Sequence, residues 1–164
     1  MNQHAVPQKT RKKLMTALAI LAVVLLAVYP ILAFQIDDWS RDLTTNHAET
    51  SLDAGDQALR PLSSDRSVDE TAAAIQRAAD TLPRWTFEGR TDEGGVATLY
   101  FVRATRLLGF KDDITLRVEP AAGGAVIHGT SQSRVGKGDL GQNPRNLKEI
   151  LAAVQQQLDA PPDA

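Results

Sequence analysis

Residues 112–119 read Asp-Asp-Ile-Thr-Leu-Arg-Val-Glu, and from Ile114 onward apolar and polar side chains alternate. Successive side chains of a β-strand point to opposite faces, so this alternation predicts a strand with one buried face and one solvated face. Further segments rich in aromatic and β-branched residues lie at residues 84–89, 96–105 and 125–133. Glycine-containing connections at 92–95 and 120–124 have lengths typical of hairpins. The pattern predicts an antiparallel meander of four strands.

Two amphipathic helices flank this meander. Ser67, with Glu70 three residues later, forms a capping box, and the apolar stripe that follows ends before Pro83. Its members are Val68, Ala72, Ile75, Ala79 and Leu82. Near the C-terminus, Asn143 and Pro144 are typical of an N-cap and a first helical residue. The second stripe consists of Leu147, Ile150, Leu151, Val154 and Leu158.

The expected fold class is therefore α+β, with a four-stranded antiparallel meander, both helices on one face, and the order α-β-β-β-β-α. We assign residues 65–158 to this ectodomain and residues 159–164 to a disordered tail. Residues 35–64 are rich in Asp, Ser, Thr and Asn and have no helical or strand period, which favours a tether. The alternative is an irregular segment packed over the domain through Trp39, Leu43 or Leu59.

The N-terminal region contains an apolar run of a different kind. Residues 14–34 form 21 positions without a charge, and a helix of that length spans about 30 Å, the thickness of a bilayer's hydrocarbon core. Basic residues in segment 1–13 precede it and Asp37 and Asp38 follow it, which predicts a cytoplasmic N-terminus and a translocated C-terminal domain. The alternative is a cleavable signal peptide, but the best cleavage match has Ile31 at the −3 position, where a small residue is preferred.

Charge and cysteine content exclude several classes of function. Four of the 18 cations precede the apolar run, which leaves fourteen against 20 acids and a net charge of −6 from Gln35 onward. Such an acidic body is a poor match for a nucleic-acid backbone, so we expect no nucleic-acid partner. The chain contains no cysteine, which excludes disulfides, thiolate metal sites and a cysteine nucleophile.

Two connections carry more glycine and charge than a plain sheet requires, at residues 103–113 and 131–143. The second runs into the predicted last helix, where glycines and free N–H groups favour a small anion such as phosphate or carboxylate. The alternative is a structural latch in which Arg134 pairs with Asp112, Asp113 or Asp139. The candidate binding cluster is Arg103, Arg106, Asp112, Asp113, Arg134, Lys137, Asp139 and Asn143.

Catalytic and metal interpretations have less support. Asp112 and Asp113 are adjacent on a strand and should point to opposite faces, so they cannot form one facing pair. The sequence contains no EF-hand loop, P-loop, dinucleotide fingerprint or nucleophile elbow around His128, and we expect no metal or cofactor. The apolar clump Leu107, Leu108 and Phe110 should either plug the core or contact lipid or a partner.

The two connections also carry a family resemblance. Gly109, Phe110, Asp112 and Asp113 match a G-F-x-D-D run, and residues 131–143 match S-x-S-R-V-G-x-x-D-x-G-x-N, followed by Arg145. Over roughly residues 59–158 the chain resembles the bacterial and plastid family called domain of unknown function 1499. The resemblance implies a fold and no established activity. The cysteine-containing stretch that many members carry upstream of the first helix is absent here.

These observations favour a single-pass protein of the bacterial inner membrane with a periplasmic domain. We expect a non-enzymatic module that binds an envelope protein or a small anionic ligand. The alternative is an enzyme acting on a lipid or cell-wall fragment, with His128, Asp112 or Asp139 as general base and Arg134 as anion stabiliser.

Overall fold

The computed structural model describes residues 8–35, 39–106 and 108–160, and the chain divides into two compact units between residues 37 and 38. The first unit contains helix α1 (Gln8–Gln35), which includes Pro30. Within the described part of the chain, α1 is the one helix long and apolar enough to cross a membrane, and none of its Lys9–Pro30 window is buried. An N-terminal apolar helix of spanning length is therefore present, as the composition predicts.

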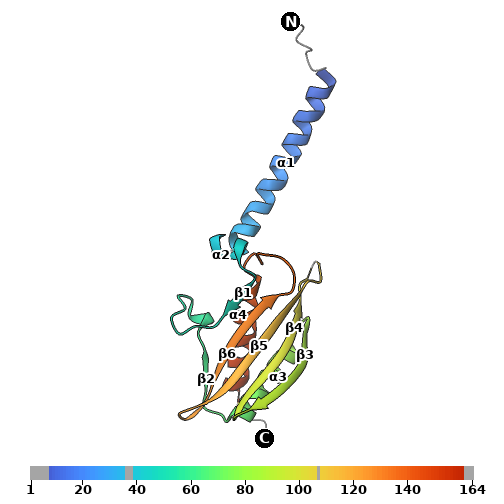
Figure 1. Ribbon diagram of the computed structural model, residues 1–164. Coiled ribbons are helices and arrows are strands. Elements are labelled where there is room, and N and C mark those ends of the chain that lie inside the picture. Colours follow the sequence, from blue (N-terminus) through green and yellow to red (C-terminus); the bar gives the residue numbers. More distant parts are fainter. Residues whose placement is uncertain (1–7, 36–38, 107, 161–164) are drawn as a thin grey trace. The chain divides into compact units, whose positions relative to one another are not determined.

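The second unit is a sheet with two helices packed on one face (Figure 1). It begins with the short helix α2 (Trp39–Thr44), strand β1 (His47–Glu49), the 3-10 turn η1 (Gln57–Leu59) and strand β2 (Leu62–Ser64). Helix α3 (Val68–Thr81) then precedes four long strands, β3 (Trp85–Glu93), β4 (Val96–Ala104), β5 (Lys111–Ala121) and β6 (Gly124–Ser133). Helix α4 (Gln142–Asp159) ends the unit, and residues 161–164 of the predicted tail lie outside the described residues.

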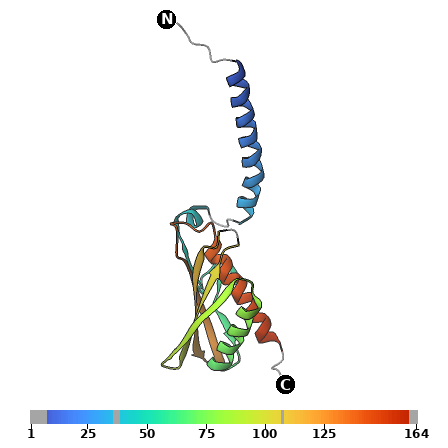
Figure 2. The same cartoon turned by 90° about the vertical axis from the view of Figure 1, so that its right-hand side faces the viewer.

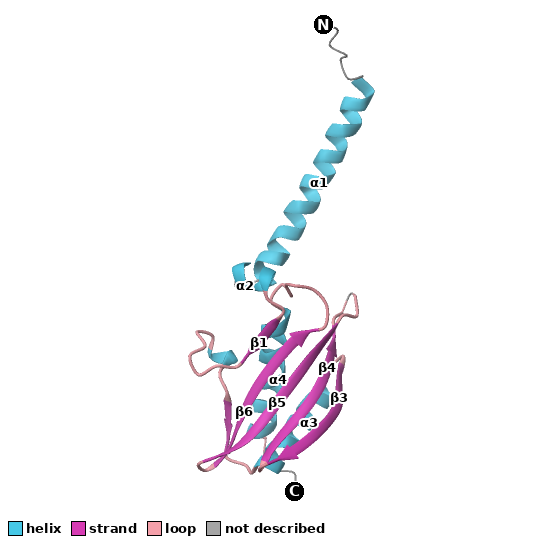
Figure 3. Ribbon diagram, in the orientation of Figure 1, coloured by secondary structure: helices cyan, strands magenta, loops and turns pink. Residues whose placement is uncertain are grey.

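The sheet has six strands and not the four expected from the sequence. Strands β3 to β6 form the predicted antiparallel meander, and β1 and β2 both pair with the outer edge of β6 (Figure 3). These two added strands come from the segment assigned to a tether. Each has three residues, which is too short to display a strand period in the sequence. Residues 47–64 therefore belong to the sheet and its connections, which matches the packed-segment alternative more closely.

Helices α3 and α4 both cover the same sheet face, and the core lies between them and the sheet (Figure 2). Alternation places Leu99, Phe101 and Leu116 on this face with no more than 1% of their surface exposed. The predicted capping box of α3 is present, because Ser67 Oγ accepts from the Glu70 N–H and the Glu70 carboxylate accepts from the Ser67 N–H. The Ser67 hydroxyl, which donates to the Glu70 carboxylate at 2.6 Å, and the Ser67 N–H together hold the pKa of Glu70 below its ordinary value.

The start of α4 differs from the prediction. The helix begins at Gln142 with Gly141 as N-cap, so Asn143 and Pro144 both lie inside the first turn. Gly141 has φ 74°, a left-handed conformation that glycine adopts without a steric penalty. Proline is tolerated throughout the first turn because its missing N–H has no intrahelical acceptor there. The Asn-Pro pair therefore marked the correct region but not the cap itself.

Candidate functional site

Asp112 and Asp113 point to opposite faces of β5, as their adjacency predicts. Asp112 lies beneath the helices with 1% of its surface exposed, and its Oδ2 accepts a hydrogen bond of 2.9 Å from Asn146 Nδ2 on α4. Asp113 is exposed on the other face and binds Arg134, whose Nε and Nη2 lie 2.9 and 2.6 Å from Asp113 Oδ1. This carboxylate raises the pKa of Arg134 above its ordinary value. The two acids therefore have separate environments and separate roles.

A buried polar network surrounds Asp112. Ser131 Oγ donates to Asn143 Oδ1 at 2.6 Å and accepts from Asn146 Nδ2 at 3.1 Å. Gln142 Nε2 donates in turn to Asn146 Oδ1 at 2.7 Å. Within the described part of the chain, no buried side-chain nitrogen or oxygen lacks a hydrogen-bond partner. The network is fully satisfied, which is the condition under which buried polar groups favour one defined structure.

The same network joins three segments that are distant in sequence. Asn143 Nδ2 donates to the Asn46 backbone oxygen at 2.7 Å and to Ser133 Oγ at 3.0 Å, and it also contacts the Asp139 carboxylate. Asn46 Nδ2 donates to the Gly136 oxygen at 2.8 Å. We call Asn46, Ser131, Asp139, Asn143 and Asn146 the polar latch, since together they hold residues 134–141 between β1 and α4.

The predicted anion position at the start of the last helix holds an anion from the protein itself. The Asp139 carboxylate accepts hydrogen bonds of 2.8 Å from the backbone N–H groups of Gly141 and Asn143. Free N–H groups and the helix dipole favour negative charge at this place. Asp139 supplies that charge and so acts as a helix-capping group.

The remaining predicted residues lie at the edge of this region. Arg103 Nε binds Glu149 Oε2 of α4 at 2.9 Å, and Trp85 Nε1 donates to the same oxygen at 3.3 Å. Arg106 and Lys137 are exposed in the two connecting loops. The structure therefore brings Asp139 and Asn143 together in the polar latch. Asp112 accepts a hydrogen bond from Asn146 of the same latch. It places Arg103, Arg106, Arg134 and Lys137 around them.

The residues of the enzymatic alternative do not converge on one site. His128 pairs in register with Arg117 on the sheet face opposite the helices, whereas Asp112 lies beneath α4. Asp139 is occupied by the helix N-terminus and Arg134 by Asp113. General acid–base catalysis requires these groups within hydrogen-bond reach of one reacting centre. The described geometry gives this set no shared centre.

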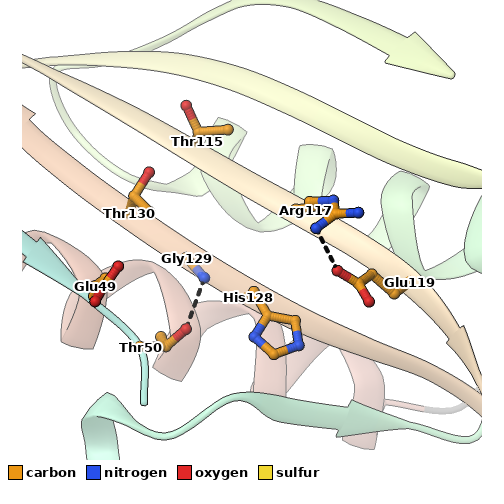
Figure 4. Close-up of a pocket in the computed structure, with 8 residues that line it drawn as sticks. All are labelled: Glu49, Thr50, Thr115, Arg117, Glu119, His128, Gly129 and Thr130. Atoms are coloured by element: carbon orange, nitrogen blue, oxygen red, sulfur yellow. Dashed lines mark hydrogen bonds and ion pairs between the residues drawn. The ribbon is translucent and has the colours of Figure 1, made fainter. Parts of the chain in front are cut away.

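A hollow of about 440 Å³ lies instead on the sheet face that α3 and α4 leave uncovered, which we call the open face (Figure 4). Arg117 Nη1 binds Glu119 Oε1 at 2.7 Å on one side of it. The backbone N–H of Gly129 donates to Thr50 Oγ1 at 2.9 Å on the other side. The open-face hollow is lined by Glu49, Thr50, Thr115, Arg117, Glu119, His128, Gly129 and Thr130.

Comparison with known protein families identifies the family of this chain. A family model described as "Protein of unknown function (DUF1499)" matches residues 38–154, which is more than half of the chain. The chain belongs to this DUF1499 family. No curated protein matches it. The DUF1499 match begins where the second compact unit begins, and it includes β1 and β2 as well as the meander.

Sequence reasoning missed several polar residues of this DUF1499 domain. Asn146 of the latch follows Asn143 by three positions and precedes Ile150 by four, a spacing that places all three on one helix face. An asparagine in a buried apolar stripe indicates a specific polar partner, and that pattern could have revealed it. Asn46 and the open-face residues Thr115 and Thr130 carry no comparable pattern. Pairing across strands brings these residues into place.

Proposed function

We propose that this DUF1499 protein is a single-pass membrane-anchored binding module that acts without catalysis. α1 spans the membrane with its basic N-terminus in the cytoplasm, and the folded domain lies on the opposite side, in the periplasm of a bacterial cell. The length and apolar composition of α1 support the span, and the preceding basic residues Lys9, Arg11, Lys12 and Lys13 support the orientation.

In this proposal the open-face hollow is the binding site. One observation supports this choice of site. Both long helices of the domain pack on one sheet face, while the other keeps a hollow whose volume lies in the range typical of small-ligand sites. Polar side chains are ordinary on the solvated face of an antiparallel sheet, so it is the hollow and not their polarity that supports this proposal. The polar latch, by contrast, serves to hold the loops.

The chemistry of the hollow favours a partner or ligand that carries an acidic group. Arg117 has 57% of its side chain exposed, and its ion pair with Glu119 uses Nη1. A guanidinium group has five N–H donors in a planar fork, so it retains capacity for a carboxylate or phosphate. The hydroxyls of Thr115 and Thr130 add neutral donors beside it. Glu49 and Glu119 would favour a group that also carries a positive charge nearby.

Site-directed photocrosslinking in living cells tests this function. One full-length chain carries a photoreactive amino acid in place of Thr130, which lines the hollow. The control chain carries it in place of Arg77, which is exposed on α3 on the other side of the sheet. We expect one dominant adduct from position 130. Arg117→Ala should abolish it, because the acidic group loses its cation, while Arg77→Ala should leave it unchanged.

An adduct of the same identity from both positions would contradict a site on the open face. If the adduct at position 130 still formed in the Arg117→Ala chain, Arg117 would not be the cation that binds the acidic group. Many weak adducts without a dominant one would favour a purely structural role in envelope organisation.

A further inference from the structure

The exposed apolar side chains of the domain are concentrated at one end of it. Among residues 40–106 and 108–160, seven large hydrophobic side chains are exposed, and Leu52 and Tyr100 are two of them. The other five lie in α2, in the β4–β5 connection and in the β6–α4 connection. We call these five the apolar end: Leu43, Leu108, Phe110, Val135 and Leu140. Leu108 and Phe110 of the predicted apolar clump have 72% and 49% of their surface exposed, so neither plugs the core, and Leu107 lies outside the described residues.

Backbone hydrogen bonds hold the three segments of the apolar end together. The N–H groups of Asp139 and Leu140 donate to the Asp42 oxygen in α2 at 3.1 and 2.9 Å. The N–H of Arg134 donates to the Lys111 oxygen at 3.0 Å, which ties the β6–α4 connection to the start of β5. Both views of the ribbon place these segments at the same end of the sheet (Figures 1 and 2). The apolar end is therefore one structured surface.

Charge around the apolar end is suited to an anionic surface. Arg106 and Lys137 are exposed in the same connections as the apolar side chains, and Lys111 is exposed at the start of β5. Two acids at this end are already engaged, since Asp113 binds Arg134 and Asp139 binds the start of α4. Apolar side chains with Lys and Arg beside them are typical of protein surfaces that enter the headgroup zone of a membrane.

The connection between α1 and α2 is short enough to keep the apolar end close to a bilayer that α1 spans. α1 ends at Gln35 and α2, which carries Leu43 of the apolar end, begins at Trp39, so three residues separate the two helices. The four Cα–Cα steps from Gln35 to Trp39 reach at most about 14 Å when extended. The headgroup zone on each side of a bilayer is itself about 5–8 Å thick. A domain joined to a span by so short a connection carries α2 in or next to that zone.

We propose that the apolar end docks on the bilayer that holds α1, with its apolar side chains at the headgroup–acyl boundary and Arg106, Lys111 and Lys137 against lipid phosphates. This inference rests on the proposed membrane anchoring. It accounts for an apolar surface that neither the core nor the open-face hollow uses. It also assigns Arg106 and Lys137, two exposed cations of the predicted anion-binding cluster, to lipid phosphate.

Depth-dependent fluorescence quenching tests the docking, and the absence of native cysteine makes single-site labelling direct. The full chain is prepared as Leu108→Cys, Val135→Cys and, as the control at the opposite end of the sheet, Glu93→Cys. Each is labelled with a fluorophore and reconstituted into vesicles of phosphatidylethanolamine and phosphatidylglycerol with brominated acyl chains. We expect the brominated lipid to quench the labels at 108 and 135 strongly and the label at 93 hardly at all.

Equal, weak quenching at all three positions in floated vesicles would overturn docking while leaving the anchor intact. Protection of positions 108 and 135 from aqueous iodide without lipid quenching would also overturn it, because another protein surface, such as a second copy, would then cover the apolar end. Failure of the vesicles to retain the chain on flotation would overturn both the docking and the proposed anchor.

Discussion

Polar side chains occupy one end of the core in place of apolar ones. Asp112, Ser131, Asn143 and Asn146 are each no more than 1% exposed, and hydrogen bonds to one another and to the 134–141 connection satisfy them. Such a cluster contributes specificity, because an apolar side chain at any of these positions would leave a buried partner without a hydrogen bond. At the residue scale, the latch fixes where α4 begins and where the loop beside it lies.

Asn143→Ala should lower the free energy of unfolding by roughly 2–4 kcal/mol. The reason is that the Ser131 hydroxyl, the Asn46 carbonyl and the Asp139 carboxylate would each lose a hydrogen bond. Urea denaturation of the full chain in detergent, followed by tryptophan fluorescence, measures the loss. Gln156→Ala, an exposed position in the same helix, is the control and should shift stability by less than about 0.5 kcal/mol. Equal effects of the two variants would show that the latch contributes nothing beyond helix propensity.

At the scale of elements, periodicity predicted the long helices and the meander, because a period needs several residues to appear. The stripes of α3 and α4 and the alternation in β5 each extend over several turns or pairs, and the buried residues follow them. β1 and β2 were missed since each contributes three residues to the sheet. The predicted start of α4 was wrong because Asp139, three positions before the helix, accepts hydrogen bonds from the N–H groups at the start of α4. The open-face hollow was missed because its residues come together only through strand pairing.

The pairing of β2 with β6 depends on a glycine. A Cβ added at Gly124 would lie 2.1 Å from the Ser64 backbone oxygen, a distance that requires the backbone to move. Gly124→Ala should therefore displace β2 and cost roughly 1–3 kcal/mol of stability, the range of overpacked sites. Hydrogen exchange should become faster at residues 62–64.

The matched control for this substitution is Gly55→Ala, where an added Cβ would meet no atom within 4 Å. It should leave both stability and exchange at residues 62–64 unchanged. Retained protection of β2 in the Gly124→Ala chain would mean that β2 does not depend on this close approach.

At the scale of the whole molecule, we propose a separate task for each part. In this proposal α1 anchors the chain in a membrane, the apolar end docks the domain on that membrane, and the open-face hollow binds a partner or ligand. The polar latch holds residues 134–141 between β1 and α4. Composition alone indicated the first task, since an uncharged run of 21 residues stands out in any sequence. The apolar end required the structure, because Leu43, Leu108 and Val135 are far apart in the chain.

Site-specific labelling of two single-cysteine chains, Gln3→Cys and Glu93→Cys, tests the central claim that the domain lies across the membrane from the N-terminus. Each full-length chain is expressed in bacteria and treated with a membrane-impermeant maleimide before and after permeabilisation of the inner membrane. We predict that position 93 reacts in intact cells, that position 3 reacts only after permeabilisation, and that both chains stay in the membrane fraction at high pH. Reaction of position 3 before position 93, or release of either chain as a soluble protein with its N-terminus intact, would contradict it.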